Sequence, residues 1–270
     1  MKLSVSNIAW RGENDLEMYQ YLADSGITGL EIAPTRIFPV NPYDDLNSAA
    51  AFASKLKENF GLVVSSMQAI WYGLTENIFD GENERNHLLE YTKKAIRFAH
   101  AIECKNIVFG CPRNRAYPEG KADYMQTVYD FFNKIGEYAL ALDTCIALEP
   151  NPVIYNTNFI NTSAEAVAFC KAINCPGIKV NLDFGTILAN GESIAEIAQD
   201  MDWVNHIHLS EPHLVPILER EEHIAMRDVL LCKQNTQCDM PYVSIEMANT
   251  NHIKDVQDAI KYVRRVFCGI

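Results

Sequence analysis

The sequence predicts an α/β protein whose parallel strands close into a (β/α)8 TIM barrel. Eight short apolar runs rich in β-branched residues alternate with longer amphipathic segments along the 270 residues. No linker or low-complexity stretch interrupts the alternation, so we expect one domain over residues 1–270. Neither GxGxxG nor GxxxxGKS/T occurs, whereas a doubly wound sheet usually has a phosphate loop after its first strand. An open parallel sheet with extra strands is therefore the less favoured alternative.

The apolar runs have the length and composition of buried parallel strands. Each is followed by a segment long enough to cross back over the sheet, and eight such units are the number that closes a TIM barrel. The expected strands are residues 3–9, 28–33, 62–68, 106–110, 145–150, 178–184, 204–210 and 242–247.

The segments between the runs carry apolar residues at helical spacing. Gly26 and Gly61 are placed to end the first two helices, and Thr162 with Glu165 forms a capping box that begins the fifth. The expected helices are residues 16–24, 44–60, 84–102, 122–142, 163–173, 193–201, 222–232 and 252–267.

The amino-acid composition indicates which class of ligand the protein binds and in which cellular compartment it lies. With 35 acidic and 23 basic residues the net charge is −12, which would repel a nucleic-acid backbone, and no basic block offsets it. No run approaches the roughly 20 apolar residues that span a membrane, and MKLSVSNIAW lacks the apolar core of a signal peptide. The eight cysteines form no CxxC pair and mostly lie in apolar segments, as buried thiols do. We expect a cytoplasmic protein without disulfides that binds a small molecule.

Polar residues at the ends of the last four expected strands share one parity. In each of these strands the apolar residues take the parity that faces the helices, which leaves Glu149, Asp183, His208 and Glu246 facing the barrel interior. Three carboxylates in a partly buried space cannot all stay ionised without a compensating charge. A divalent cation is the simplest remedy, and this ligand set suits Mn²⁺, Mg²⁺ or Co²⁺, with Zn²⁺ a further candidate.

Four motifs carry these residues: ALEPN (147–151), NLDFG (181–185), HIHLSEP (206–212) and SIEM (244–247). In this order they resemble the xylose isomerase-like barrel superfamily, which includes ketose 3-epimerases, hydroxypyruvate isomerases, inosose dehydratases and endonuclease IV. The resemblance covers nearly the whole chain. It implies that Glu149, Asp183, His208 and Glu246 are metal ligands, and that Glu149 and Glu246 also exchange a proton with the substrate carbon.

Three positions depart from the ketose epimerase pattern. This chain has Thr186 and Leu214 where those epimerases carry a His and an Arg, and Gln68 where the third strand often ends in His. The departures speak against a free ketohexose as substrate. Endonuclease IV-like chains need further His and carboxylate ligands for a three-metal cluster, and the acidic charge also opposes DNA.

Several other residues are candidates for contact with substrate. Glu31 shares the inward parity, although a strand-end acid can also serve a loop. Arg113 and Arg115 follow the fourth strand, and we favour a ligand role for Arg113 and a solvated position for Arg115. The remaining candidates are Trp10, as an aromatic wall or a core residue, Gln68, Glu211 and His213. His206 lies about 7 Å deeper than His208, so we expect it to support the site by hydrogen bonding.

The resemblance, together with the convergent carboxylates, implies a divalent-metal-dependent isomerase or epimerase. Its substrate would be a small sugar, sugar phosphate or sugar acid, with proton abstraction next to a carbonyl and Glu149 and Glu246 as the acid/base pair. Two alternatives stay open: a dehydratase of a polyol or keto-inositol type substrate, and a non-catalytic sugar-binding module. We expect no nucleic-acid or membrane partner, and the sequence is compatible with a homo-oligomer.

Overall fold

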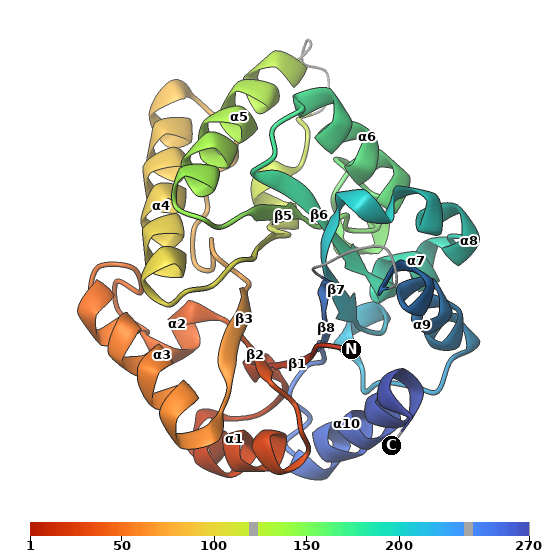
Figure 1. Cartoon of the computed structure of the whole chain (residues 1–270). Coiled ribbons are helices and arrows are strands. Elements are labelled where there is room, and N and C mark those ends of the chain that lie inside the picture. Colours follow the sequence, from red (N-terminus) through yellow and green to blue (C-terminus); the bar gives the residue numbers. More distant parts are fainter. Residues whose placement is uncertain (119–123, 235–239, 270) are drawn as a thin grey trace.

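The computed structural model describes residues 1–118, 124–234 and 240–269, and eight parallel strands close into a barrel in chain order (Figure 1). Strand β1 pairs with both β2 and β8, which completes the ring. The fold and all eight expected strands are confirmed. The strands are β1 (Leu3–Ser6), β2 (Gly29–Ile32), β3 (Val63–Met67), β4 (Ile107–Phe109), β5 (Ile146–Leu148), β6 (Ile178–Asp183), β7 (Val204–Leu209) and β8 (Tyr242–Ile245).

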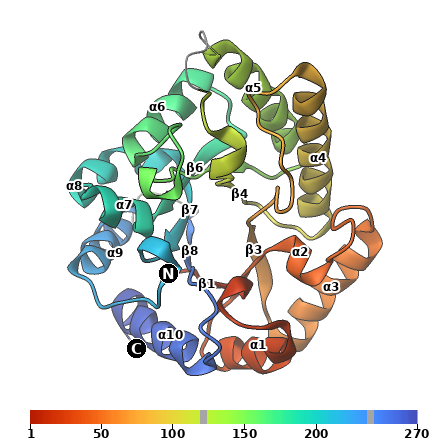
Figure 2. The ribbon, with the colours of Figure 1, turned by 180° about the vertical axis from the view of Figure 1, so that it is seen from behind.

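Helices surround the barrel, and Figure 2 shows its opposite end. In the described residues the α-helices are α1 (Asp15–Asp24), α2 (Pro34–Ile37), α3 (Leu46–Phe60), α4 (Glu82–Ala101), α5 (Met125–Ala141), α6 (Ser163–Ile173), α7 (Phe184–Asn190), α8 (Ile194–Ile197), α9 (Glu221–Gln234) and α10 (Ile253–Cys268). Short 3-10 helices are η1 (Asn7–Ala9), η2 (Gly12–Asn14), η3 (Pro112–Arg115), η4 (Val153–Tyr155), η5 (Ala198–Trp203) and η6 (Pro212–Leu214).

The differences from the expected elements lie mainly at strand ends. Helix α7 was not expected, because Phe184 reads as the end of a strand; instead the Asp183 side chain caps the helix by accepting from Thr186 N. The helix expected at 193–201 is divided into α8 and η5. Most strands stop earlier than expected because the chain turns at the barrel mouth, as after β1, where Ser6 caps η1. Residues 122–123 of an expected helix lie outside the described residues.

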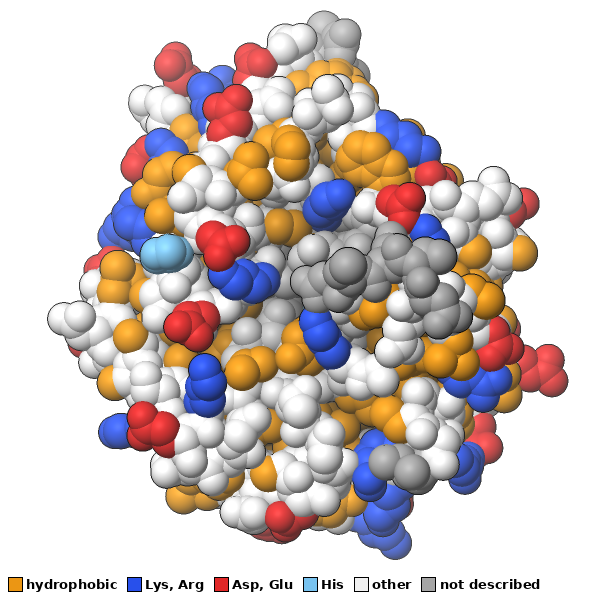
Figure 3. All heavy atoms as spheres, viewed as in Figure 1, with side chains coloured by type: hydrophobic (Ala, Val, Ile, Leu, Met, Phe, Trp, Pro, Cys, Tyr) orange, Lys and Arg blue, Asp and Glu red, His pale blue; other side chains and the backbone are white. Residues whose placement is uncertain are grey.

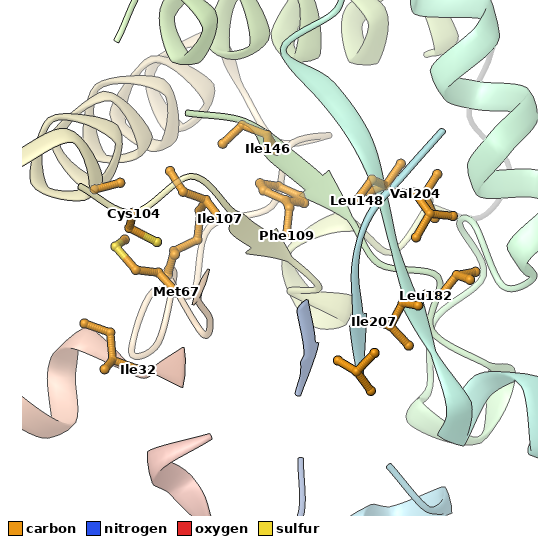
Figure 4. Close-up of a cluster of buried hydrophobic side chains, with 14 of the residues drawn as sticks. Ile32, Met67, Cys104, Ile107, Phe109, Ile146, Leu148, Leu182, Val204 and Ile207 are labelled. Atoms are coloured by element: carbon orange, nitrogen blue, oxygen red, sulfur yellow. The ribbon is translucent and has the colours of Figure 1, made fainter. Parts of the chain in front are cut away.

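The outward faces of the strands form the core between barrel and helices. Ile146, Leu148, Leu182 and Ile207 have exposed fractions of only 0–1%. Figure 4 shows them in a cluster with residues of neighbouring strands, such as Phe109. Burying one such side chain contributes about 2 kcal/mol. This packing confirms the outward parity from which the inward polar set was inferred.

Polar side chains fill the barrel interior and pair with one another there. The hydroxyl oxygens of Ser4 and Ser65 lie 2.6 Å apart, and Asn106 Nδ2 donates to Ser66 Oγ over 2.9 Å. All four residues are buried. The pairing offsets the cost of removing them from water and gives the barrel a polar axis that leads to its mouth.

Charges of both signs are interspersed over the face in Figure 3, where the amino ends of the strands lie. None of the described helices combines the length and hydropathy that crossing a membrane requires. The described cysteines are free thiols, and Cys104, Cys145, Cys170 and Cys175 are buried. Cys238 lies outside the described residues.

Candidate metal centre

Four side chains meet where β5 to β8 end. Glu149 and Glu246 each follow a strand by one residue, yet their backbone N–H groups still donate to neighbouring strands, Glu149 to Phe109 O (3.1 Å) and Glu246 to Leu209 O (2.9 Å). Asp183 ends β6 and pairs in register with His208 of β7. Ligand atoms of Glu149, Asp183, His208 and Glu246 all lie within 4.8 Å of one another. The structure thus brings together the four residues that parity selected.

The imidazole of His208 lies between the two glutamates. Its Nδ1 is 2.9 Å from Glu149 Oε1 and 3.1 Å from Glu246 Oε2. Despite these short distances, Nδ1 has no aligned hydrogen-bond partner among the described residues, although it is buried. An unpaired buried nitrogen facing carboxylate oxygens fits a divalent cation, which would accept its lone pair and theirs.

Asp183 is held by two hydroxyl residues. Thr186 donates to Asp183 Oδ2 from both its backbone N and its Oγ1, each over 2.8 Å, and Ser210 Oγ donates to Oδ1. Thr186 Oγ1 also lies 2.8 Å from Pro150 O, and the residue is fully buried. Thr186 therefore positions the Asp183 carboxylate.

Two amides hold the carboxylate of Glu149. Asn181 Nδ2 donates to Oε1 over 2.7 Å, and Asn151 Nδ2 donates to Oε2 over 3.2 Å. Asn181 is fully buried and Asn151 nearly so. Sequence reasoning missed both residues, although Asn181 has the inward parity two residues before Asp183.

Burial and neighbouring charges shift the pKa values of Glu246, Asp183 and His208 toward the forms that carry more positive charge. Burial raises the pKa of Glu246 to about 7, against the opposing effect of His208. Burial also raises the pKa of Asp183, and the charge of Glu149 adds to this. For His208 burial acts downward, yet the charges of Glu246 and Glu31 raise its pKa well above the usual range. A divalent cation held there would supply that charge and keep the carboxylates ionised.

Glu31 lies beneath the cluster rather than on a surface open to substrate. It is fully buried, with Oε2 2.9 Å from His208 Nε2 and 3.1 Å from His206 Nε2. Gln68 Nε2 donates to its Oε1 over 3.1 Å. Burial would raise the pKa of Glu31, but the two imidazoles hold it below its usual range. A substrate contact was among our expectations for Glu31, and the structure instead gives it contacts with both histidines.

The Glu31 carboxylate lies on the Nε2 side of His208, away from the other two glutamates. With a cation on the cluster side, a proton on Nε2 would be donated to Glu31 and the Nδ1 lone pair would be left for the cation. His206 is buried with its Nε2 3.1 Å from the same oxygen, but that nitrogen has no aligned hydrogen-bond partner among the described residues, so a supporting role stays a prediction.

The two arginines after β4 lie opposite to our expectation. Arg113 is exposed, whereas Arg115 is fully buried and donates from Nη2 to Glu149 O (2.6 Å) and to Asn151 Oδ1 (2.7 Å). Burial lowers the pKa of Arg115 to about 10. The 3-10 turn η3 begins after Cys111 in the left-handed region (φ 45°), and it directs Arg115 rather than Arg113 inward. Arg115 therefore holds the main chain from which Glu149 projects.

Glu211 and His213 have structural contacts after β7. Glu211 is buried and accepts from Arg220 Nε over 2.9 Å and from Leu218 N over 3.1 Å, so it fixes the segment before α9. His213 is exposed, and its backbone N donates to Tyr155 OH over 2.8 Å. A role in substrate binding stays a prediction for both residues.

Trp10 and Gln68 differ in their relation to the site. Trp10 is 2% exposed, and its Nε1 donates to Asp15 Oδ1 over 2.8 Å, which favours the core interpretation. Gln68 lines a cavity of about 900 Å³ that also reaches Glu246. This cavity lies on the side of β1 to β3, next to the four-residue cluster.

The chain belongs to the xylose isomerase-like TIM barrel family, whose sequence model matches residues 19–266. No curated protein matches the sequence. Among solved structures it is similar to the 3-keto-D-glucoside 4-epimerase YcjR from E. coli, with TM-score 0.78, 19% identity and coverage of 98% of this chain and 99% of that one.

Other solved structures share the fold. D-psicose 3-epimerase from Clostridium cellulolyticum H10 has TM-score 0.77 and 15% identity, with 99% of each chain covered. The IOLI protein with a bound zinc atom has TM-score 0.72 and 17% identity, covering 100% of this chain and 97% of that one. A probable 3-DHS dehydratase is also among the similar structures. At these identities the similarity establishes the fold alone.

Proposed function

We propose that this protein is a metal-dependent isomerase or epimerase of a carbohydrate-like substrate. The observation that carries the proposal is the convergence of Glu149 and Glu246, from β5 and β8, on the same nitrogen of His208. Sugar epimerases among the similar structures support it. The proposal includes a single catalytic domain over residues 1–270, a cytoplasmic location and no nucleic-acid partner.

In this proposal the two glutamates act on opposite sides of one substrate carbon. Their strands are separated by β6 and β7 in the ring, so a substrate at the mouth would meet one carboxylate on each side. One glutamate takes the proton next to the carbonyl, and the other delivers a proton to the opposite face. Asn151 and Asn181 keep the carboxylate of Glu149 oriented for this transfer.

The cation would be held by Glu149, Asp183, His208 and Glu246. Bound there, it supplies Lewis-acid stabilisation of the negative charge that develops on the carbonyl oxygen. The ligand set is compatible with Mn²⁺, Mg²⁺, Co²⁺ or Zn²⁺, and a structure of the same fold that binds a zinc atom supports a metal cofactor.

The experiment is a proton-exchange screen. Metal-loaded protein is incubated in deuterium oxide with keto sugars, their phosphates and their acids, and the recovered sugars are analysed by mass spectrometry. We expect deuterium at one carbon, with a rate that falls about 10²- to 10⁴-fold in Glu149→Gln and Glu246→Gln. Glu137→Gln, an exposed change on α5, is the matched control and should keep the rate. Conversion without entry of deuterium would contradict the proposal.

A dehydratase is the second candidate, supported by the dehydratase among the similar structures. After the same proton abstraction, loss of a β-hydroxyl as water would give a product lighter by one water. The screen separates the two reactions by product mass. Tight binding of a sugar without exchange or water loss would indicate a sugar-binding module instead.

A further inference from the structure

A large cavity adjoins the candidate metal centre on the side of β1 to β3. Its volume is about 900 Å³, and it extends outward from Gln68 and Glu246 past Thr35 and Asn41 to Tyr91 of α4. Cavities of roughly 300 to 1,000 Å³ enclose ligands of drug size. The cavity is therefore large enough for more than one sugar ring, of which only one can reach Glu246.

The basic residues of the cavity wall are already paired. Arg36 forms a two-bond contact with Asp15, with Nη2 2.6 Å from Oδ1 and Nη1 3.3 Å from Oδ2, and also donates to Trp10 O. Lys94 Nζ lies 2.8 Å from Asp44 Oδ1. A phosphate or carboxylate would have to displace these partners, so the wall favours an uncharged, hydroxyl-rich ligand.

Tyr72 offers an aromatic surface at the edge of this cavity. It is 73% exposed, whereas its neighbour Trp71 is 2% exposed and packs against Phe109 at 4.7 Å between ring centroids. Ala69 and Gly73 flank the turn in the left-handed region, with φ of 53° and 88°, and Tyr72 N donates to Ala69 O. The turn thus buries one aromatic side chain and presents the next to solvent, as suits stacking on the apolar face of a sugar.

We propose that the cavity binds the second, uncharged sugar unit of a disaccharide or glycoside, with that unit stacked on Tyr72. The first unit would then present its reacting carbon between Glu246 and Glu149. This inference rests on the proposed function for the first unit, but the binding of the second can be measured without any turnover.

The test measures binding rather than turnover, with sugars that carry no keto group. Dissociation constants of metal-loaded protein for cellobiose, maltose, sucrose, methyl glucoside and glucose 6-phosphate are measured by saturation-transfer NMR. We expect at least one disaccharide to bind about tenfold more tightly than methyl glucoside. Tyr72→Ala should remove that gain and leave methyl glucoside unchanged, whereas Tyr72→Phe should keep it. Leu140→Ala, an exposed apolar change on α5, is the control.

Three outcomes would overturn the inference. They are no disaccharide binding above that of methyl glucoside, tightest binding of glucose 6-phosphate, and an undiminished disaccharide preference in Tyr72→Ala. The deuterium screen reports separately on the proposed function. Tighter disaccharide binding without proton exchange would support the second-sugar site and contradict the isomerase. Proton exchange with single sugars, without tighter disaccharide binding, would support the isomerase and contradict the second-sugar site.

Discussion

The two halves of the barrel mouth differ in what they contribute. Strands β5 to β8 supply the four candidate metal ligands, each at or next to a strand end. Strands β1 to β3 supply Gln68 and the loops that enclose the adjoining cavity. Glu31 of β2 is the link, because it crosses the interior to contact His208. In the proposed function, one half would hold the reacting group and the loops of the other would contact the rest of the substrate.

Removing the metal should have the largest effect, and it tests the role of the β5 to β8 half. Dialysis against a chelator should reduce proton exchange to background, because three carboxylates would lose their shared counter-charge. Free metal at about 100 times its Kd stabilises a protein by about 3 kcal/mol, so the melting temperature should also fall. Calorimetry and the exchange assay measure the two effects. Full exchange by metal-free protein would contradict the assignment.

Replacing Arg115 tests how much its hydrogen bonds stabilise the main chain of the β5 to β8 half. Arg115→Met should lower the free energy of unfolding by about 2 to 4 kcal/mol, because Glu149 O and Asn151 lose a buried donor. The exposed Arg113→Met should change it by about 0.5 kcal/mol or less. Urea titration of the two variants gives the comparison. Equal changes in the free energy of unfolding of the two variants would show that the buried contacts of Arg115 do not stabilise the protein.

Replacing Glu31 tests the contact between the two halves of the barrel mouth, because Glu31 of β2 contacts His208 of β7. Glu31→Gln should weaken Mn²⁺ binding about 10- to 100-fold, since the amide no longer favours a proton on His208 Nε2. The exposed Glu17→Gln on α1 should leave the affinity unchanged. Isothermal titration of metal into both variants measures this. An unaltered Kd in Glu31→Gln would limit Glu31 to packing.

The smallest expected effect comes from the helical shell behind β7 and β8. Burial lowers the pKa of His223 to about 4, and its Nδ1 lies 3.0 Å from Tyr262 OH. Its folded pKa is below the unfolded value, so the unfolded chain takes up the proton first and stability is lost as pH falls from about 6.5 toward 4. Between neutral pH and pH 5.5 the free energy of unfolding should fall by about 1 kcal/mol more in the unaltered protein than in His223→Gln. Urea titration at several pH values measures this difference. Parallel pH profiles of the two proteins would count against this.

Much of the fold and the centre of the site could be predicted from the sequence because strand parity is a strict geometric rule. It placed Glu149, Asp183, His208 and Glu246 on one face without reference to loops. It could not predict the directions of side chains farther along the loops, beyond residues such as Glu149 and Glu246 that still bond to a neighbouring strand. Arg113 and Arg115 have the same chemistry, yet within the turn η3 the first is exposed and the second is buried.

Parity also could not predict partners across the barrel. Glu31 was correctly expected to face inward, but its contact with His208 depends on ring closure between residues 177 apart in the chain. Trp10 and Tyr72 both follow strands, and only the loop conformations decide that the first is buried and the second exposed. The short helix α7 was missed because Asp183 serves both as a strand end and as a helix cap.

The most direct test of the central claim is the electron spin echo spectrum of Mn²⁺ bound to protein with ¹⁵N-labelled histidine. The structure predicts coupling to one histidine nitrogen, kept in His206→Asn and lost in His208→Asn. Coupling to two histidines, or coupling that persists in His208→Asn, would show that the cation is not held by Glu149, Asp183, His208 and Glu246.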